Sequence, residues 1–425
     1  MSRQRLRPAR LGTPTRRPGI LAVLSGVVLA MLGCGTGKPA PSPYACGTPS
    51  AGHCYGTTLG PPAQGRPTGG SMLMNTLTVD GSGRGDLFFT DEMWLDEGFN
   101  DIRAWVEAGQ IYDLLGLRYF WAQLRVAPNR DPLENTFTSY SLGPVTATDA
   151  TAGTTVGIRR TAPDAFAVRI LASGSSYSAQ TVNHMWTRTK DFGSLTIGLE
   201  LAGTTGAFAQ PVSMQPRWWD TAGALHEWSL PVASSPDPPQ ADPPIHVGWL
   251  LPPGPQGAIW LTSCCTKPSS ALGPQTADRL GAGAAEALIV KRNPVKPPPV
   301  PEERPPSAAV GVAPRNVDVV ANPDSLPQAV RDGLLGKIGA TSNVTVTRSG
   351  CDPASVVTQH LPGQPTAGLD PTRSLCWFEL AGKFGVATPP SRSSASTTLQ
   401  FDAAYAVFDA QTHSLLSAGA FHPTS

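Results

Sequence analysis

The stretch RAWVEAGQIYDLLGLRYFWAQLR, Arg103–Arg125, contains two short runs in which apolar and aromatic residues predominate. Similar β-rich runs, such as DLFFTDEMWL and LTIGLELAG, recur between Ser71 and about Ser263. Clusters of Gly, Ser, Asp and Pro separate these runs, and long helical periodicity is scarce. This spacing predicts a mainly β chain, with an antiparallel β-sandwich of the concanavalin or jelly-roll kind over residues 46–265.

Side chains alternate across a strand, so parity sorts the residues of the opening stretch into two faces. In the first run Ala104, Val106 and Ala108 share one face, which leaves Trp105 and Glu107 on the other. If the two runs pair with their small residues on one side, the other side combines a set of aromatic and polar residues: Trp105, Glu107, Tyr119, Trp121 and Gln123. Aromatic planes beside carboxylate and amide groups suit a sugar or an extended peptide, so we predict a binding face here.

Two further glutamates fall on strand faces of the same kind. Glu92 shares parity with Trp94 in DLFFTDEMWL, and both are candidate binding residues. Glu200 lies opposite the apolar side of LTIGLELAG, on the side where Gly198 leaves room for a ligand or another backbone to approach. Antiparallel sheets commonly have one face exposed to solvent, so the alternative that each glutamate is only a solvent-exposed surface residue stays open.

The segments IRAWVEAG and RYFWAQLR resemble the strand pair of glutamic peptidases, including neprosin-like proteins, in which a glutamate-bearing strand precedes an aromatic one. Downstream, AFAVRIL, SLTIGLELAG and FAQPVSMQ are similar in order to the neprosin run that carries a second glutamate. The resemblance spans residues 102–215 and implies that Glu107 and Glu200 are catalytic carboxylates, although Leu199 stands where neprosins have a glycine. Such a pair would share a water, with one glutamate as base and the other, protonated, as acid, which implies activity in acid.

The first 33 residues have the layout of a signal peptide, because six arginines without an acidic residue precede a mostly apolar run, Ile20–Leu32. This run is shorter than the roughly 20 apolar residues of a spanning helix. The following MLGC, Met31–Cys34, resembles the bacterial lipobox, whose cysteine is lipidated and becomes the mature N-terminus. We therefore expect removal of residues 1–33, a lipid on Cys34 that holds the protein outside the cytoplasm on the bacterial cell membrane, and a flexible tether over residues 34–45. An ordinary secretory signal is the alternative.

Loss of the signal segment changes the charge balance. The whole chain has a formal net charge of +1, and removal of six arginines changes +1 to about −5. No basic surface is implied, so we expect an extracellular glycan or polypeptide as the partner and no nucleic acid.

Export also places six cysteines where disulfides persist. They are Cys46, Cys54, Cys264, Cys265, Cys351 and Cys376. A Cys351–Cys376 bridge is predicted because no other cysteine lies in the C-terminal region. Among the other four, two crossing bridges and a Cys46–Cys54 bridge beside a vicinal pair both stay open. The chain has no Cys-x-x-Cys pair and no His pair at helical spacing, so we expect neither a metal nor a cofactor.

The chain divides again at a proline-rich segment. NPVKPPPVPEERPP, Asn293–Pro306, has seven prolines in fourteen residues, and we predict a short helix and a stiff linker over residues 266–314. Residues 315–425 predict a small α+β domain. Asp324 or Ser325 can cap a helix with Pro327 in its first turn, and three later runs, NVTVTRS, SLCWFELAGKFGV and TTLQFDAAYAVFDAQTHSLLSAGAF, supply strands.

Three functions remain open from these patterns. The first is a lipid-anchored cell-surface protein whose sandwich binds a glycan or peptide polymer on its aromatic and carboxylate face. The second is an acid endopeptidase of the glutamic type that uses Glu107 and Glu200, and the third is a structural envelope lipoprotein. The observation that separates them is whether these two carboxyl groups converge closely enough to share one water.

Overall fold

Antiparallel β-strands build nearly all of the described chain, which confirms the predicted fold class. The computed structural model describes residues 53–59, 67–74, 76–77, 79–80, 88–99, 102–125, 131–146, 149, 153–162, 165–172, 176–182, 194–202, 208–209, 212–227, 240–241, 246–250, 258–262, 317–388 and 397–423. The predicted signal segment, tether and linker, together with Cys34, Cys46, Cys264 and Cys265, lie outside these ranges. Among the helices within them, none is long and apolar enough to cross a membrane.

The larger sheet has the strand order β15-β1-β11-β4-β5-β6-β7-β22-β21-β20-β18, and β19 pairs with β20 beside this path. Its strands from the predicted sandwich are β1 (Cys54–Leu59), β4 (Phe88–Phe99), β5 (Ile102–Asp113), β6 (Gly116–Arg125), β7 (Thr136–Pro144), β11 (Ser194–Ala202) and β15 (Gln240–Ala241), and a short 3-10 turn η1 (Pro132–Glu134) precedes β7. The four neighbouring strands β11, β4, β5 and β6 carry the predicted catalytic and binding residues.

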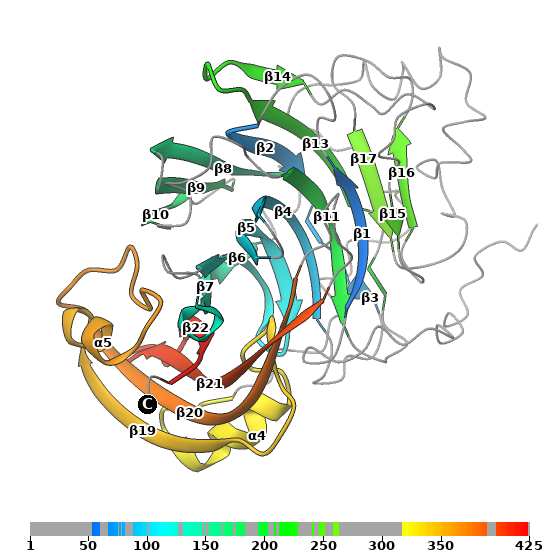
Figure 1. The fold of residues 1–425 in the computed structure, drawn as a ribbon. Coiled ribbons are helices and arrows are strands. Elements are labelled where there is room, and N and C mark those ends of the chain that lie inside the picture. Colours follow the sequence, from blue (N-terminus) through cyan, green and yellow to red (C-terminus); the bar gives the residue numbers. More distant parts are fainter. Residues whose placement is uncertain are drawn as a thin grey trace, which may run out of the picture. The chain divides into compact units, whose positions relative to one another are not determined.

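The second sheet has the order β10-β9-β8-β2-β13-β17-β16, with β14 paired to β13. Its strands are β2 (Gly69–Met74), β8 (Thr154–Ala162), β9 (Ala165–Leu171), β10 (Ser176–Val182), β13 (Val212–Trp219), β14 (Leu225–Glu227), β16 (His246–Leu250) and β17 (Ala258–Thr262), while β3 (Val79–Asp80) pairs with β12 (Phe208–Ala209). Figure 1 shows β2, β8 and β13 stacked over β4, β5 and β11. One apolar core fills the space between the two sheets, as a sandwich requires.

The C-terminal strands continue the larger sheet, because β22 pairs with β7. This region contains η3 (Pro323–Ser325), α4 (Leu326–Arg331), β18 (Ile338–Ala340), β19 (Thr345–Pro353), α5 (Ala354–His360), β20 (Ser374–Ala387), β21 (Thr398–Asp409) and β22 (Leu415–Phe421). The predicted helix therefore exists but ends at Arg331, and its Ser325 makes no side-chain capping hydrogen bond. A second core joins this region to the sandwich, since Trp94, Trp105 and Phe120 pack in one cluster with Leu334 and Leu335.

The pairing of β5 with β6 corrects the predicted faces. A two-residue turn joins the strands, with Asp113 opposite Gly116, and this register places Glu107 opposite Ala122 and Ala108 opposite Trp121. Residues that face each other share a side of the sheet. Each strand alternates as predicted, but the prediction that Tyr119, Trp121 and Gln123 share a face with Trp105 and Glu107 is wrong, because the length of the turn sets the relative phase of the two strands.

The predicted Cys351–Cys376 disulfide is confirmed. The two cysteines lie directly opposite each other on β19 and β20. Cys54 at the start of β1 is also disulfide-bonded, and the other cysteines of the predicted sandwich bridges lie outside the described ranges. The choice between the two bridging patterns therefore stays a prediction.

Candidate functional site

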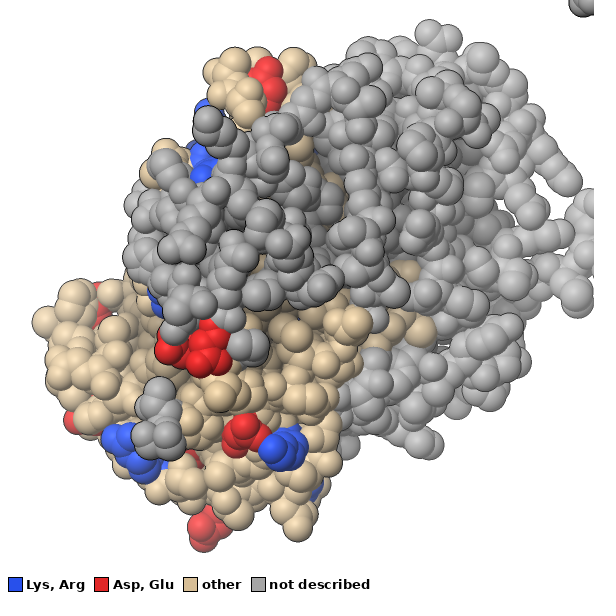
Figure 2. Space-filling model, in the orientation of Figure 1, with Lys and Arg blue, Asp and Glu red and all other residues tan. Residues whose placement is uncertain are grey.

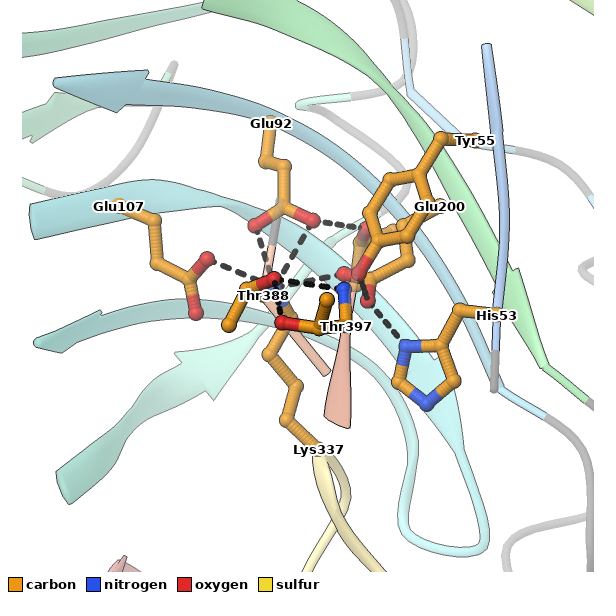
Figure 3. Close-up of polar contacts among 9 residues, drawn as sticks. His53, Tyr55, Glu92, Glu107, Glu200, Lys337, Thr388 and Thr397 are labelled. Carbon is orange, nitrogen blue, oxygen red and sulfur yellow. Dashed lines mark hydrogen bonds and ion pairs between the residues drawn. The ribbon is translucent and has the colours of Figure 1, made fainter. Parts of the chain in front are cut away.

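Three glutamates from neighbouring strands converge on one lysine (Figure 3). Glu92 on β4, Glu107 on β5 and Glu200 on β11 each place an Oε2 atom close to Nζ of Lys337, at 2.8, 2.8 and 2.7 Å respectively. Glu107 Oε2 and Glu200 Oε2 are therefore no farther apart than the sum of two such distances. We call Glu92, Glu107 and Glu200 the carboxylate cluster.

Strand register explains why these side chains meet. Trp94 is directly opposite Glu107, and Glu92 lies between Gly109 on one side and Gly198 on the other. The glycine in VEAG serves the close approach of β5 to β4, because a Cβ on Gly109 would lie 2.0 Å from the backbone oxygen of Asp91. With a glycine on each side, Glu92 has space to turn toward the centre of the cluster.

The cluster is closed to solvent in this structure. The exposed fractions are 0% for Glu92, 1% for Glu107, 1% for Glu200 and 4% for Lys337. The ammonium lies 5.8 Å from the centre of the Trp94 ring and 5.2 Å from that of Phe120, within the range of cation–π attraction. Burial of charge without compensation is costly, and here the lysine supplies the compensation.

Glu200 has further partners of its own. The hydroxyl of Tyr55 donates a hydrogen bond of 2.6 Å to Glu200 Oε1, and His53 Nδ1 also contacts this oxygen. Burial acts to raise the pKa of Glu200, but Lys337 and then His53 outweigh it and hold the pKa well below its usual range. Glu200 is therefore the member of the cluster that is most strongly stabilised in its ionised form.

The other two glutamates have the opposite tendency. Burial raises the pKa of Glu92 and of Glu107, and the attraction of Lys337 offsets this only in part. Lys337 donates hydrogen bonds to both oxygens of Glu92, and Thr90 donates one to Glu92 Oε1. Neither oxygen of Glu107 has a hydrogen bond of good geometry, although the indole of Trp94 lowers its pKa as a nearby donor. Glu107 is thus a carboxyl group that takes up a proton more readily than an ordinary glutamate.

The lysine responds to the same surroundings. Burial alone would lower the pKa of Lys337, but Glu107, Glu200 and Glu92 outweigh it and raise the pKa above its ordinary value. Lys337 is therefore an ammonium at any pH at which the protein would work.

The remaining predicted binding residues divide between the two faces of the sheet. Trp94 and Trp105 lie with the carboxylate cluster in the second core. Tyr119 and Trp121 belong to the core between the two sheets, where the Tyr119 hydroxyl is 2.8 Å from Thr154 Oγ1. All of these residues and Gln123 are at most 1% exposed, so they do not form an open aromatic surface.

Sequence reasoning missed Lys337, Tyr55 and His53. Tyr55 lies opposite Glu200 on β1, but nothing in the sequence pairs β1 with β11. Lys337 follows a short helix as one of seven lysines, far along the chain from all three glutamates. Among the described residues, no group of three or more His, Cys, Asp and Glu side chains is placed to hold a metal ion.

Comparison with known proteins gives remote structural likenesses alone. No family model and no curated protein matches the sequence. Scytalidoglutamic peptidase with a peptide-based transition-state analogue aligns over 50% of this chain and 97% of its own, with 8% identity and a TM-score of 0.31. SCP-B, an eqolisin-family peptidase with a bound tripeptide, aligns over 50% of this chain and 97% of its own, with 10% identity and a TM-score of 0.29. Tailspike protein 2 of bacteriophage CBA120 aligns over 37% of this chain and 23% of its own, with 17% identity and a TM-score of 0.24. The structural neighbours of the chain thus include glutamic peptidases, at low similarity.

Proposed function

We propose that the protein is an acid-acting hydrolase of peptide bonds in which Glu107 and Glu200 share the catalytic water. The observation that carries this proposal is the convergence of Glu107 Oε2 and Glu200 Oε2 on one point, at 2.8 and 2.7 Å. Nζ of Lys337 now occupies that point. A water oxygen in its place would lie within hydrogen-bonding distance of both carboxyl groups.

The surroundings of the two groups assign their roles. Tyr55 and His53 contact Glu200 independently of Lys337, so we assign Glu200 the role of base: it accepts a proton from the water as the water oxygen attacks the peptide carbonyl carbon. Glu107 has no comparable partners, and its raised pKa favours the protonated form that donates to the carbonyl oxygen. Collapse of the tetrahedral intermediate then breaks the C–N bond: the amine takes up the proton that Glu200 received, and a hydroxyl of the intermediate returns its proton to Glu107 as the carboxylic acid forms. Glu92 holds its oxygens in other hydrogen bonds and serves to position the pair.

The test compares the purified protein with Glu107→Gln and Glu200→Gln on a denatured protein substrate near pH 4. Each substitution keeps the shape of the side chain but removes its acid–base function, so cleavage should fall by about 10² or more. Glu379→Gln is the matched control, because Glu379 lies on β20 and pairs with the half-exposed Arg348. Cleavage that survives both cluster substitutions excludes the proposed mechanism.

We also propose that this activity belongs outside the cytoplasm, with the protein anchored through a lipid on Cys34. The Cys351–Cys376 bridge supports the compartment, because disulfides persist in oxidising environments. Feeding cells a labelled fatty acid should label the protein, and Cys34→Ser should abolish the label. Label that remains on Cys34→Ser would place the lipid elsewhere or exclude the anchor.

A further inference from the structure

The segment that carries Lys337 is shaped to reach into the larger sheet. It runs from Asp332 to Ile338, between α4 and β18, and has left-handed backbone at Gly333 (φ 94°) and Gly336 (φ 62°). Such backbone is readily adopted only by glycine. A Cβ on Gly336 would lie 3.0 Å from Oδ2 of Asp113, so the segment passes against the turn that ends β5. The two glycines thus let the chain bend sharply before and after Leu334 and Leu335, and Lys337 follows directly after the second bend.

Buried apolar side chains hold this segment in place. Leu334 and Leu335 are at most 2% exposed and pack in the second core with Trp94, Trp105 and Phe120. Burial of two leucine side chains stabilises the docked segment by roughly 1.5–3 kcal/mol each. The segment therefore covers the carboxylate cluster and inserts the ammonium at its centre.

The charges around the ammonium come from every strand that faces it. β4 contributes Glu92, β5 contributes Glu107 and β11 contributes Glu200. His53, just before β1, is the other titratable group with a potential positive charge, and it contacts Glu200 rather than Lys337. Replacement of buried ion clusters by apolar residues is often neutral or stabilising. Apolar residues would therefore join the Lys337 segment to the larger sheet at least as stably as three carboxylates and a lysine do.

We infer that Lys337 is an internal inhibitor of the Glu107–Glu200 pair, so that the chain with this segment docked is latent and opens when the segment leaves the sheet. The inference rests on the function proposed above. Its basis is geometric: the ammonium lies at the point that both proposed catalytic oxygens contact, and the two carboxyl groups and the ammonium are almost fully buried. While the ammonium lies at that point, a water cannot occupy it.

Acid weakens the hold of the cluster on Lys337. Each carboxylate that takes up a proton loses its attraction for the ammonium, and burial makes Glu92 and Glu107 take up protons at a higher pH than an ordinary glutamate. Glu200 then remains as the ionised partner, shared between Lys337, Tyr55 and His53. The conditions that suit the proposed chemistry are thus also the conditions that loosen the inhibitor.

The experiment measures access to the carboxyl groups without relying on activity. The full chain and Lys337→Ala are treated with glycidol, a small epoxide that esterifies carboxylates, and labelling of Glu107 and Glu200 is followed by peptide mass spectrometry. The exposed Asp370 serves as the internal reference. We expect both glutamates to be at least ten times slower than in Lys337→Ala, while Lys383→Ala, which removes an exposed lysine, leaves labelling unchanged. Equal labelling of the wild type and Lys337→Ala would overturn the inference.

Parallel cleavage assays near pH 4 separate this inference from the proposed function. Faster cleavage by Lys337→Ala than by the wild type supports both. Faster labelling without cleavage supports the inhibitory contact and excludes the peptidase, whereas equal cleavage by both proteins supports the peptidase and excludes inhibition. If Lys337→Ala does not fold, Lys337→Met keeps the side-chain stem beside Trp94 and Phe120 and is compared in the same way.

Discussion

Replacement of Lys337 by methionine should strongly destabilise the protein at alkaline pH. The substitution keeps an unbranched stem but removes the cation that three buried carboxyl groups share. Loss of one partner of a buried ion pair costs about 3–5 kcal/mol, because a buried charge is left without compensation. Total stability is typically about 5–15 kcal/mol, so this single change removes a large part of it. For a domain of this size the melting temperature should fall by roughly 6–20 °C at pH 8.

The loss should become smaller as the pH falls. Burial and mutual repulsion already raise the pKa of Glu92 and Glu107 in the folded protein. A carboxyl group whose folded pKa exceeds its unfolded pKa destabilises the fold fully above the folded pKa, and this cost shrinks as the pH falls from the folded pKa to the unfolded pKa. Without Lys337 the folded pKa values rise further, so the variant recovers stability by taking up protons as the pH falls toward the ordinary pKa of a glutamate. Glu200 behaves in the opposite way in the wild type, since its lowered pKa stabilises the fold above about pH 4.5.

Thermal unfolding followed by circular dichroism at pH 8 and pH 5 checks this prediction. Lys383→Met is the matched control, because Lys383 has a side chain that is 63% exposed and pairs with the exposed Asp402. An exposed pair contributes at most about 1 kcal/mol, with little dependence on pH in this range. The reasoning is refuted if Lys337→Met melts within the range of the control at pH 8, or if its deficit does not change with pH.

Three other predictions follow from single features of the fold. Gly109→Ala should cost about 3 kcal/mol or more in urea unfolding, because its Cβ would meet backbone atoms of β4 at 2.0 and 2.7 Å, and a near-neutral result would contradict the close approach of these strands. Replacement of both Cys351 and Cys376 by serine should cost about 3 kcal/mol under non-reducing conditions, since the bridge closes a loop of 25 residues; an unchanged melting temperature would show that it adds nothing. Tyr55→Phe should cost about 1.5–3 kcal/mol above the unfolded pKa of a glutamate and, by raising the folded pKa of Glu200, should make the acid-induced loss of stability smaller and complete at a higher pH; a pH profile that matches the wild type would argue against the Tyr55–Glu200 hydrogen bond.

The candidate site could be predicted from sequence only in part. Parity and the resemblance singled out Glu107 and Glu200, and parity also placed Glu92 beside Trp94 on one face of a strand. The predicted aromatic surface was wrong because it assumed how β5 and β6 align. A shift of one residue moves every side chain to the other face, and the alignment depends on a turn whose length the apolar pattern does not specify. The apolar pattern also did not predict that the face with Trp94, Trp105 and Glu107 is buried, because the burial comes from packing with C-terminal residues such as Leu334 and Leu335.

The sequence by itself determined the local features of this protein: short alternating strands, which side chains of one strand share a face, the helix at α4, and the partner of Cys351. These features depend on residues that are neighbours along the chain or on a pattern with a period of two. Tertiary structure alone decided that β22 extends the sandwich sheet through β7 and that Lys337 enters the carboxylate cluster. The physical reason is that a lysine and three glutamates attract one another only once packing has brought their strands together and excluded the water that would screen them.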